Sequence, residues 1–307
     1  MSKLAFVFPG QGSQFVGMGK DLYDLHTQVR EVFDTADSIL GISLGKLCFE
    51  GPEEELRLTV NTQPALFTTS VACLRMLEKN GIRPDVTAGH SIGEYAALVA
   101  AGALPFEQGL KLVRTRAELM QKAAELHPGA MASVIGLDTD TVRAVCEKAS
   151  DAGIVDVANY NSPGQVVISG EVKAVEAASE YAKEAGAKRV LPLNVSGGFH
   201  SRLMSSAADK LGAALEAAEF TDASIPVVAN VTADYVRKAD DIRDCLARQL
   251  AGSVLWDKSV ARMSADGVDQ FVEVGPGKVL AGLIKRIADG AEIRNVGDAA
   301  SLQEYLG

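Results

Sequence analysis

The segment AGHSIGEY, residues 88–95, constrains the fold of this chain more than any other, because it places Ser91 between two glycines. A Gly-x-Ser-x-Gly pattern serves catalysis in one context, a sharp turn from a strand into a helix that exposes the serine. Here RPDVTAG reads as a strand and an alanine-rich helix follows. The context predicts a nucleophile elbow in an α/β domain. The alternative is a serine that falls between glycines by chance, since the chain has 29 of them.

The N-terminal part of the chain predicts one strand and one long helix. KLAFVFPG is typical of a short buried strand in which alternate residues from Leu4 to Phe8 face a core. Asn61 and Thr62 are good helix caps, with Pro64 in the first turn of a helix that runs toward residue 81. Strand and helix in this order favour an α/β fold.

The middle of the chain has a different pattern from the rest. From about residue 131, segments typical of strands and alanine-rich helices follow in the order strand, helix, strand, strand, helix, strand, which is the ferredoxin-like order. We therefore expect an inserted ferredoxin-like small domain over residues 127–196. The large domain, of the α/β-hydrolase-like type, is expected to combine residues 1–126 and 197–307.

Charge and cysteine spacing exclude several classes of function. A formal net charge of −10 disfavours nucleic acid as a partner, because phosphates would repel such a surface. The four cysteines lie far apart without Cys-x-x-Cys spacing, so we predict neither a disulfide framework nor a metal site. No apolar run is long enough to cross a membrane, and glycine-rich segments such as GISLGK depart from the spacing of phosphate loops. We expect a cytoplasmic monomer.

A serine nucleophile needs a base, and the chain has four histidines. His26 and His127 lie in polar surroundings and are interpreted as surface residues, while His90 adjoins Ser91 and is expected to support the elbow. His200, in SGGFHSRLM, follows a glycine turn downstream of the serine, as the base does in α/β-type serine hydrolases. Two interpretations remain open for it: a general base that titrates near the ordinary histidine pKa of about 6.5, or a structural histidine.

Two arginines lie in a helix predicted over residues 106–126, which turns an apolar face inward. Arg114 and Arg116 are two residues apart and cannot share one face of a helix. Either one of them points inward, where a guanidinium needs an anion such as a carboxylate, or both are solvated.

Taken together, the motifs of this chain resemble those of the malonyl-CoA:acyl carrier protein transacylase family over nearly its whole length. The blocks that carry the resemblance follow one another in the order of that family: FVFPGQGSQFVGMGKDLY, NTQPALF, GHSIGEYAALVAAGAL, RAELMQ, YNSPGQVVISG, GFHSRLM and FVEVGPGKVL.

The resemblance implies roles for the reacting residues. Ser91 would be the nucleophile that takes up the malonyl group, and His200 would be its general base and then its general acid. The backbone amides of Gln11 and Ile92 would form the oxyanion hole, which stabilises charge as the tetrahedral intermediate develops. Arg116 would bind the malonyl carboxylate.

The resemblance also implies a surrounding shell. Gln249 would orient His200 through a carbonyl, which makes a Ser-His dyad without the usual acid, and Phe199 would crowd an α-methyl group on the acyl chain. His90 and Asn161, the latter in the YNSPGQVVISG block, take supporting positions. Gly198 is a departure, because many members of the family have a bulkier residue or proline there, and this puts the stiffness of the His200 loop in question.

The implied reaction is ping-pong transfer of malonyl from malonyl-CoA to Ser91 and then to the phosphopantetheine thiol of acyl carrier protein, with no metal or bound cofactor. The carrier is expected to be acidic, so exposed basic pairs, Lys188 with Arg189 or Lys285 with Arg286, are candidate contacts. Three alternatives stay open: a serine acyl hydrolase, a carrier-binding subunit without catalysis, and the acyltransferase subunit of a malonate decarboxylase complex.

Overall fold

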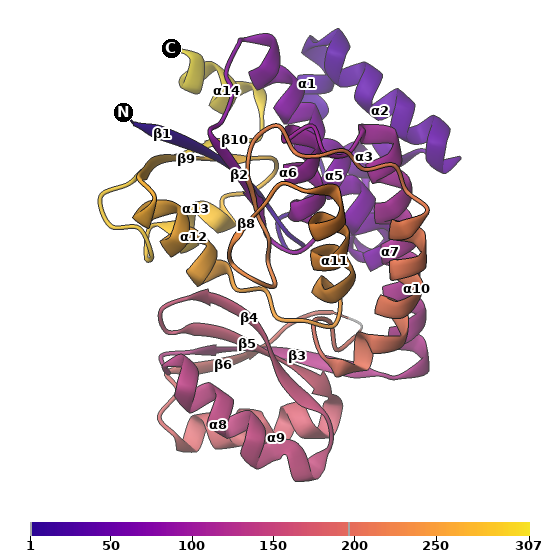
Figure 1. Ribbon diagram of the computed structural model, residues 1–307. Helices are drawn as coiled ribbons and strands as arrows, with labels where there is room; N and C mark the ends of the chain where they lie inside the picture. Colours follow the sequence, from indigo (N-terminus) through magenta and orange to yellow (C-terminus); the bar gives the residue numbers. More distant parts are fainter. Residues whose placement is uncertain (1, 196) are drawn as a thin grey trace.

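The computed structural model describes residues 2–195 and 197–307 and contains two separate sheets (Figure 1). The larger sheet has six strands in the order β10-β9-β1-β2-β7-β8, parallel throughout except for the last pair. Its strands are β1 (Lys3–Phe8), β2 (Val86–Gly89), β7 (Val227–Val228), β8 (Tyr235–Val236), β9 (Val268–Val274) and β10 (Glu292–Val296).

Strand β1 lies in the middle of this sheet, between β9 and β2. The expected alternation from Leu4 to Phe8 is wrong, because every residue from Ala5 to Phe8 is buried. The reason is topological: helices cover both faces of a parallel sheet, so a central strand buries its side chains on both sides.

Helices pack on both faces of the large sheet and bury two separate apolar cores. They are α1 (Lys20–Leu25), α2 (Thr27–Leu40), α3 (Leu44–Glu50), α4 (Glu53–Arg57), α5 (Thr59–Lys79), α6 (Gly93–Ala100), α7 (Phe106–Leu126), α10 (Ser205–Glu216), α11 (Ala239–Gln249), α12 (Trp256–Ala265), α13 (Val279–Ile284) and α14 (Ala299–Leu306), with a short 3-10 turn at Arg202–Met204.

Helix α5 begins earlier than the sequence predicts. It starts at Thr59, so Pro64 lies inside the helix rather than in its first turn. A proline there cannot bond the carbonyl four residues back, that of Val60. Arg114 of α7 donates to this carbonyl oxygen at 3.0 Å and so replaces the missing bond. The helix continues through its proline because a neighbouring side chain satisfies the freed carbonyl.

The second sheet is antiparallel, with the strand order β4-β5-β3-β6. In Figure 1 its helices α8 and α9 lie on the face turned away from the rest of the molecule, where they bury a core of their own. Its elements are β3 (Gly129–Ile135), α8 (Thr139–Ala149), a 3-10 turn (Ser150–Ala152), β4 (Val155–Ser162), β5 (Gln165–Glu171), α9 (Val172–Glu184) and β6 (Arg189–Pro192).

This strand order is that of a ferredoxin-like unit, and the predicted fold class, an α/β-hydrolase-like domain with a ferredoxin-like insertion, is confirmed. The domain limits at residues 126 and 196 stay a prediction, and Ser196 lies outside the described residues. Within the described ranges, no helix has the length and apolar character that a membrane crossing requires.

Candidate active site

Ser91 lies on a strained turn between β2 and α6. Its backbone has a φ of 52°, which is rare for a residue with a side chain. The flanking glycines allow the turn to be this tight: a Cβ at Gly89 would lie 2.0 Å from the carbonyl carbon of Gly93, and one at Gly93 would lie 2.1 Å from the Phe8 carbonyl oxygen. The Gly-x-Ser-x-Gly pattern is therefore a steric requirement of this turn.

Asn230, which follows β7, holds the turn from the other side. Its Oδ1 accepts a bond from the Ser91 amide at 2.7 Å, and its Nδ2 donates to the Gly89 carbonyl at 2.6 Å. The side chain is buried and spans the two ends of the turn. Sequence reasoning missed Asn230, because no local pattern connects it with a residue 139 positions earlier.

The structure brings His200 to the serine. Its Nε2 lies 2.7 Å from Ser91 Oγ, and its Nδ1 lies 3.0 Å from the Gln249 carbonyl oxygen and 3.1 Å from that of Gly252. Because carbonyls only accept, Nδ1 carries the hydrogen and Nε2 presents a lone pair to the serine. Burial, together with the charge of Arg116, lowers the pKa of His200 to about 3. The pKa thus lies below the ordinary histidine value of about 6.5, and the imidazole stays neutral at lower pH.

The two arginines of α7 point in different directions. Arg116 is buried, with its Nη1 bonded to Gln63 Oε1 at 2.7 Å and its Nη2 within 3.0 Å of both Ser91 Oγ and Gln249 Oε1. Within the described residues it makes no ion pair, whereas Arg114 is half-buried and pairs with Glu118. A buried guanidinium beside the serine without a bound carboxylate is a site prepared for an anion.

Gln249, the last residue of α11, joins the catalytic groups to a second buried charge. Its Nε2 donates to the Ser91 carbonyl at 3.0 Å and to Glu94 Oε2 at 2.9 Å. Glu94 Oε2 also accepts the Asn230 amide at 3.0 Å. Burial raises the pKa of Glu94 to about 7. Neither Glu94 nor Gln63 was singled out from the sequence, although Glu94 lies inside the quoted serine segment.

Ser91, His200 and Arg116 open on one cavity between the two sheets. Ile92 is the N-cap residue of α6, so its amide is one of the free donors at a helix N-terminus, and Gln11 follows β1 at the same edge of the sheet. Phe199 is buried against the same space. The lining residues are Gln11, Gln63, His90, Ser91, Ile92, Arg116, Met120, Met131, Asn159, Leu193, Val195, Phe199 and His200.

The remaining predicted residues lie at or away from this cavity. His90 Nε2 is 2.9 Å from Asn161 Oδ1, so the predicted supporting pair is in contact. His127 is exposed at the end of α7, and His26 lies between α1 and α2. Among residues 2–195 and 197–307, no cluster of three or more His, Cys, Asp or Glu could hold a metal ion.

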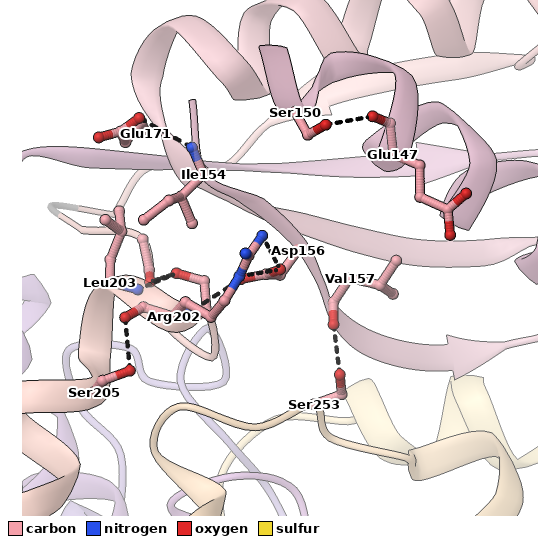
Figure 2. Close-up of polar contacts among 12 residues, drawn as sticks. Glu147, Ser150, Ile154, Asp156, Val157, Glu171, Arg202, Leu203, Ser205 and Ser253 are labelled. Atoms are coloured by element: carbon pink, nitrogen blue, oxygen red, sulfur yellow. Dashed lines mark hydrogen bonds and ion pairs between the residues drawn. The ribbon is translucent and has the colours of Figure 1, made fainter. Parts of the chain in front are cut away.

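The segment around His200 is fixed to strand β4 of the small sheet (Figure 2). Asp156 accepts the Arg202 amide at 2.9 Å and pairs with its guanidinium at 2.9–3.1 Å. Ser253, beside the Gly252 carbonyl that bonds His200, donates to the Val157 carbonyl at 2.6 Å. Both loops that hold the imidazole are thus tied to neighbouring residues of one strand.

Gly198 lies within this tightly packed segment. A Cβ there would lie 2.8 Å from Leu203 Cδ1 and 2.9 Å from the Gly170 carbonyl oxygen. The segment at Gly198 is therefore closely packed, because the backbone of β5 occupies the space that a larger residue would need.

Comparisons with known proteins agree with this geometry. Residues 5–303 match the family model described as an acyl transferase domain. The chain is 52% identical to the malonyl CoA-acyl carrier protein transacylase of Bacillus subtilis over 94% of this chain and 91% of that protein, and 49% identical to the Escherichia coli protein of the same name, with 94% of each covered.

Solved structures give the same result. An acyl carrier protein S-malonyltransferase from Vibrio cholerae superposes with a TM-score of 0.96 at 47% identity, covering 99% of this chain and 100% of that one. A malonyl transacylase in complex with the acyl carrier protein of a type II polyketide synthase has a TM-score of 0.97 at 47% identity, with 99% of both chains covered.

Proposed function

The chain belongs to the acyl transferase family, and we propose that it transfers malonyl from malonyl-CoA to the phosphopantetheine thiol of an acyl carrier protein through a malonyl-serine at Ser91. One observation carries the assignment: Ser91 Oγ lies 2.7 Å from a neutral imidazole nitrogen and 3.0 Å from a buried guanidinium nitrogen. The first contact suits a nucleophile, and the second suits an acyl group that ends in a carboxylate.

In the first half-reaction, Ser91 Oγ attacks the thioester carbonyl while its proton passes to His200 Nε2. The carbonyl oxygen becomes an oxyanion, for which the amides of Gln11 and Ile92 are the proposed donors. Collapse breaks the carbon–sulfur bond, and the imidazolium returns the proton to the departing CoA thiolate. The Gln249 and Gly252 carbonyls hold the imidazole in the required tautomer throughout.

In the second half-reaction, the carrier's thiol gives its proton to His200 and attacks the carbonyl carbon of the malonyl-serine. Collapse of the intermediate breaks the ester carbon–oxygen bond, and the imidazolium returns the proton to the departing Ser91 Oγ. Arg116 binds the malonyl carboxylate during both steps, and Phe199 limits the space beside the α-carbon. The apolar side chains that line the cavity restrict water, which favours transfer to a thiol over hydrolysis.

Two exposed basic pairs lie on the surface of the protein. Lys188 and Arg189 are exposed at the start of β6, as are Lys285 and Arg286 after α13. Arg286 also donates to Gln165 Oε1 at 2.7 Å, and this bond connects the segment after α13 to strand β5 of the small sheet. We propose these pairs as contacts for an acidic carrier, and we expect the protein to act in the cytoplasm as a monomer.

Intact-protein mass spectrometry after mixing with malonyl-CoA tests the proposal directly. We expect a single malonyl adduct on Ser91 that disappears when holo-acyl carrier protein is added, with malonyl recovered on the carrier. Release as free malonate would indicate a hydrolase, and no adduct would indicate a binding subunit.

Arg116→Ala should lose roughly 2–5 kcal/mol of transition-state stabilisation in the reaction with malonyl-CoA, because the malonyl carboxylate loses its partner. The reaction with acetyl-CoA, which has no such carboxylate, should be far less affected. Equal losses would make Arg116 structural.

A further inference from the structure

Glu94 is a buried carboxylate that the proposed mechanism leaves without a role. Its side chain is 2% exposed, and its described hydrogen-bond donors are the Gln249 amide group and the Asn230 backbone amide. Hydrogen bonds to two neutral amides stabilise a buried carboxylate but do not balance its charge. The nearest compensating charge must come from another element.

Arg116 supplies that charge through one intervening side chain. Gln249 presents its Nε2 to Glu94 at 2.9 Å and its Oε1 to Arg116 Nη2 at 3.0 Å. Carboxylate, amide and guanidinium thus form a continuous chain in which each donor meets an acceptor. Before malonyl binds, Glu94 is the counter-charge of Arg116, with the Gln249 amide group between them.

An incoming malonyl group disturbs this balance. A carboxylate carried on Ser91 Oγ would bind the Arg116 guanidinium, which is 3.0 Å from that oxygen. Two buried carboxylates would then share one guanidinium, and like charges in a buried site raise the pKa of one of them. The malonyl carboxylate gains direct contact with the guanidinium, so Glu94, which has no direct contact, is the group that becomes neutral.

We propose that Glu94 takes up one proton from solvent when the malonyl carboxylate binds Arg116, so that malonyl binding is coupled to proton uptake. The proton goes to the oxygen that does not accept from Gln249, and both amide bonds are kept. This inference rests on the proposed function, because it needs an acyl group with a terminal carboxylate.

No other group near Glu94 takes this role around neutral pH. Tyr95 on the same helix and Cys245 on α11 also face it, and burial raises their pKa values to about 12 and about 11, so both stay neutral. His200 on the far side of the serine has a pKa lowered to about 3. Burial raises the pKa of Glu94 itself to about 7, so it is the group that can exchange a proton around neutral pH.

Isothermal titration calorimetry in two buffers of different ionisation enthalpy measures the proton uptake. Ser91→Ala protein is titrated with malonyl-CoA, and with acetyl-CoA as a control that shares the CoA phosphates but lacks the carboxylate. Proton uptake should accompany malonyl-CoA binding and increase from pH 7 to pH 8, and it should be absent with acetyl-CoA.

The matched variant is Glu94→Gln in the same background, which imitates the protonated carboxylate and keeps its acceptor oxygen. It should bind malonyl-CoA with no proton uptake, and its malonyl affinity should not change between pH 6 and 8. Glu273→Gln alters an equally buried carboxylate on β9, which accepts from the Leu280 and Ala281 amides of α13, and should leave the uptake unchanged.

Two results separate the inference from the function on which it rests. Malonyl-CoA binding without proton uptake, or with the same uptake in the Glu94→Gln variant, would overturn the inference alone. Absence of a malonyl adduct on wild-type Ser91 would overturn the proposed function, whatever the calorimetry gives.

Discussion

Ser91 and His200 both have left-handed backbones, with φ of 52° and 57°, but their loops reach this conformation by different means. At Ser91 the turn is dictated within five residues, because Gly89 and Gly93 let the strand and helix backbones touch. At His200 the partners are distant: Gln249 and Gly252 bond the ring, and Asp156 anchors the segment. The nucleophile's place is a local property of the chain, whereas the base's place is assembled by the fold.

Removing the nucleophile should have the largest effect on acylation. Ser91→Ala should fold normally and form no acyl-enzyme, because the covalent step has lost its oxygen. Intact-protein mass spectrometry after incubation with malonyl-CoA checks this, with circular dichroism as the control for folding. A malonyl adduct mapped to another residue would contradict the assignment of Ser91.

Removing the base should leave the turn at Ser91 intact but slow the acylation of Ser91. His200→Ala is expected to lose about 10²–10⁴-fold in acylation rate, the usual contribution of a general base, while malonyl-CoA binding stays similar. Stopped-flow acylation measures the rate, and calorimetry measures the binding. A variant within tenfold of wild type would remove His200 from the mechanism and leave His90 as the next candidate.

The local character of the elbow predicts unequal costs for adding one methyl group in each loop. Gly93→Ala places a Cβ against the backbone oxygen of Phe8 at 2.1 Å and should cost more than the usual range for overpacking, about 1–3 kcal/mol of unfolding free energy. Gly198→Ala meets Leu203 Cδ1 at 2.8 Å, a side-chain atom that can shift, and the Gly170 carbonyl oxygen at 2.9 Å, which cannot. Because both distances are longer than 2.1 Å, it should cost less than Gly93→Ala. Urea denaturation measures the free energy of unfolding of both variants. An equal loss of that free energy would mean that the turn at Ser91 is no stiffer than the loop at His200.

The anchor of the histidine loop should have a moderate effect. Asp156→Asn keeps the shape of the side chain but removes its charge, and the pair with Arg202 is partly exposed, so we expect a loss of about 1 kcal/mol in stability and less than tenfold in acylation rate. High salt should shrink the difference from wild type by screening the pair. If the acylation rate fell a hundredfold, the ion pair would be as important to His200 as its ring partners.

The smallest expected effect is that of acid pH on the base. His200 must be neutral to accept the serine proton, and its pKa is lowered from the ordinary value to about 3, so the neutral form persists as the pH falls through 6.5. Acylation by acetyl-CoA, which avoids the Arg116 carboxylate site, should therefore stay flat between pH 5 and 7. A decline centred near 6.5 in rapid-quench measurements would show that the imidazole is more hydrated than its burial indicates.

Several features of the fold and site follow from the sequence because they depend on neighbours along the chain. The turn at Ser91 needs two glycines at fixed spacing, and the strand and helix on either side are recognisable from composition. The α8–β4–β5–α9 region was predicted from its order of strands and helices for the same reason. The resemblance to a known family then added roles for Gln11, Arg116 and Gln249 that local patterns do not give.

Other features were decided only by tertiary structure. The sequence left open which arginine of α7 turns inward; Arg114 is held by the carbonyl that Pro64 frees, while Arg116 reaches the serine. Asn230 and Glu94 were missed because their partners lie more than 130 positions away in the chain. The pKa of His200 could not be predicted either, because desolvation depends on what the folded chain places around a ring and not on the residues beside it in sequence.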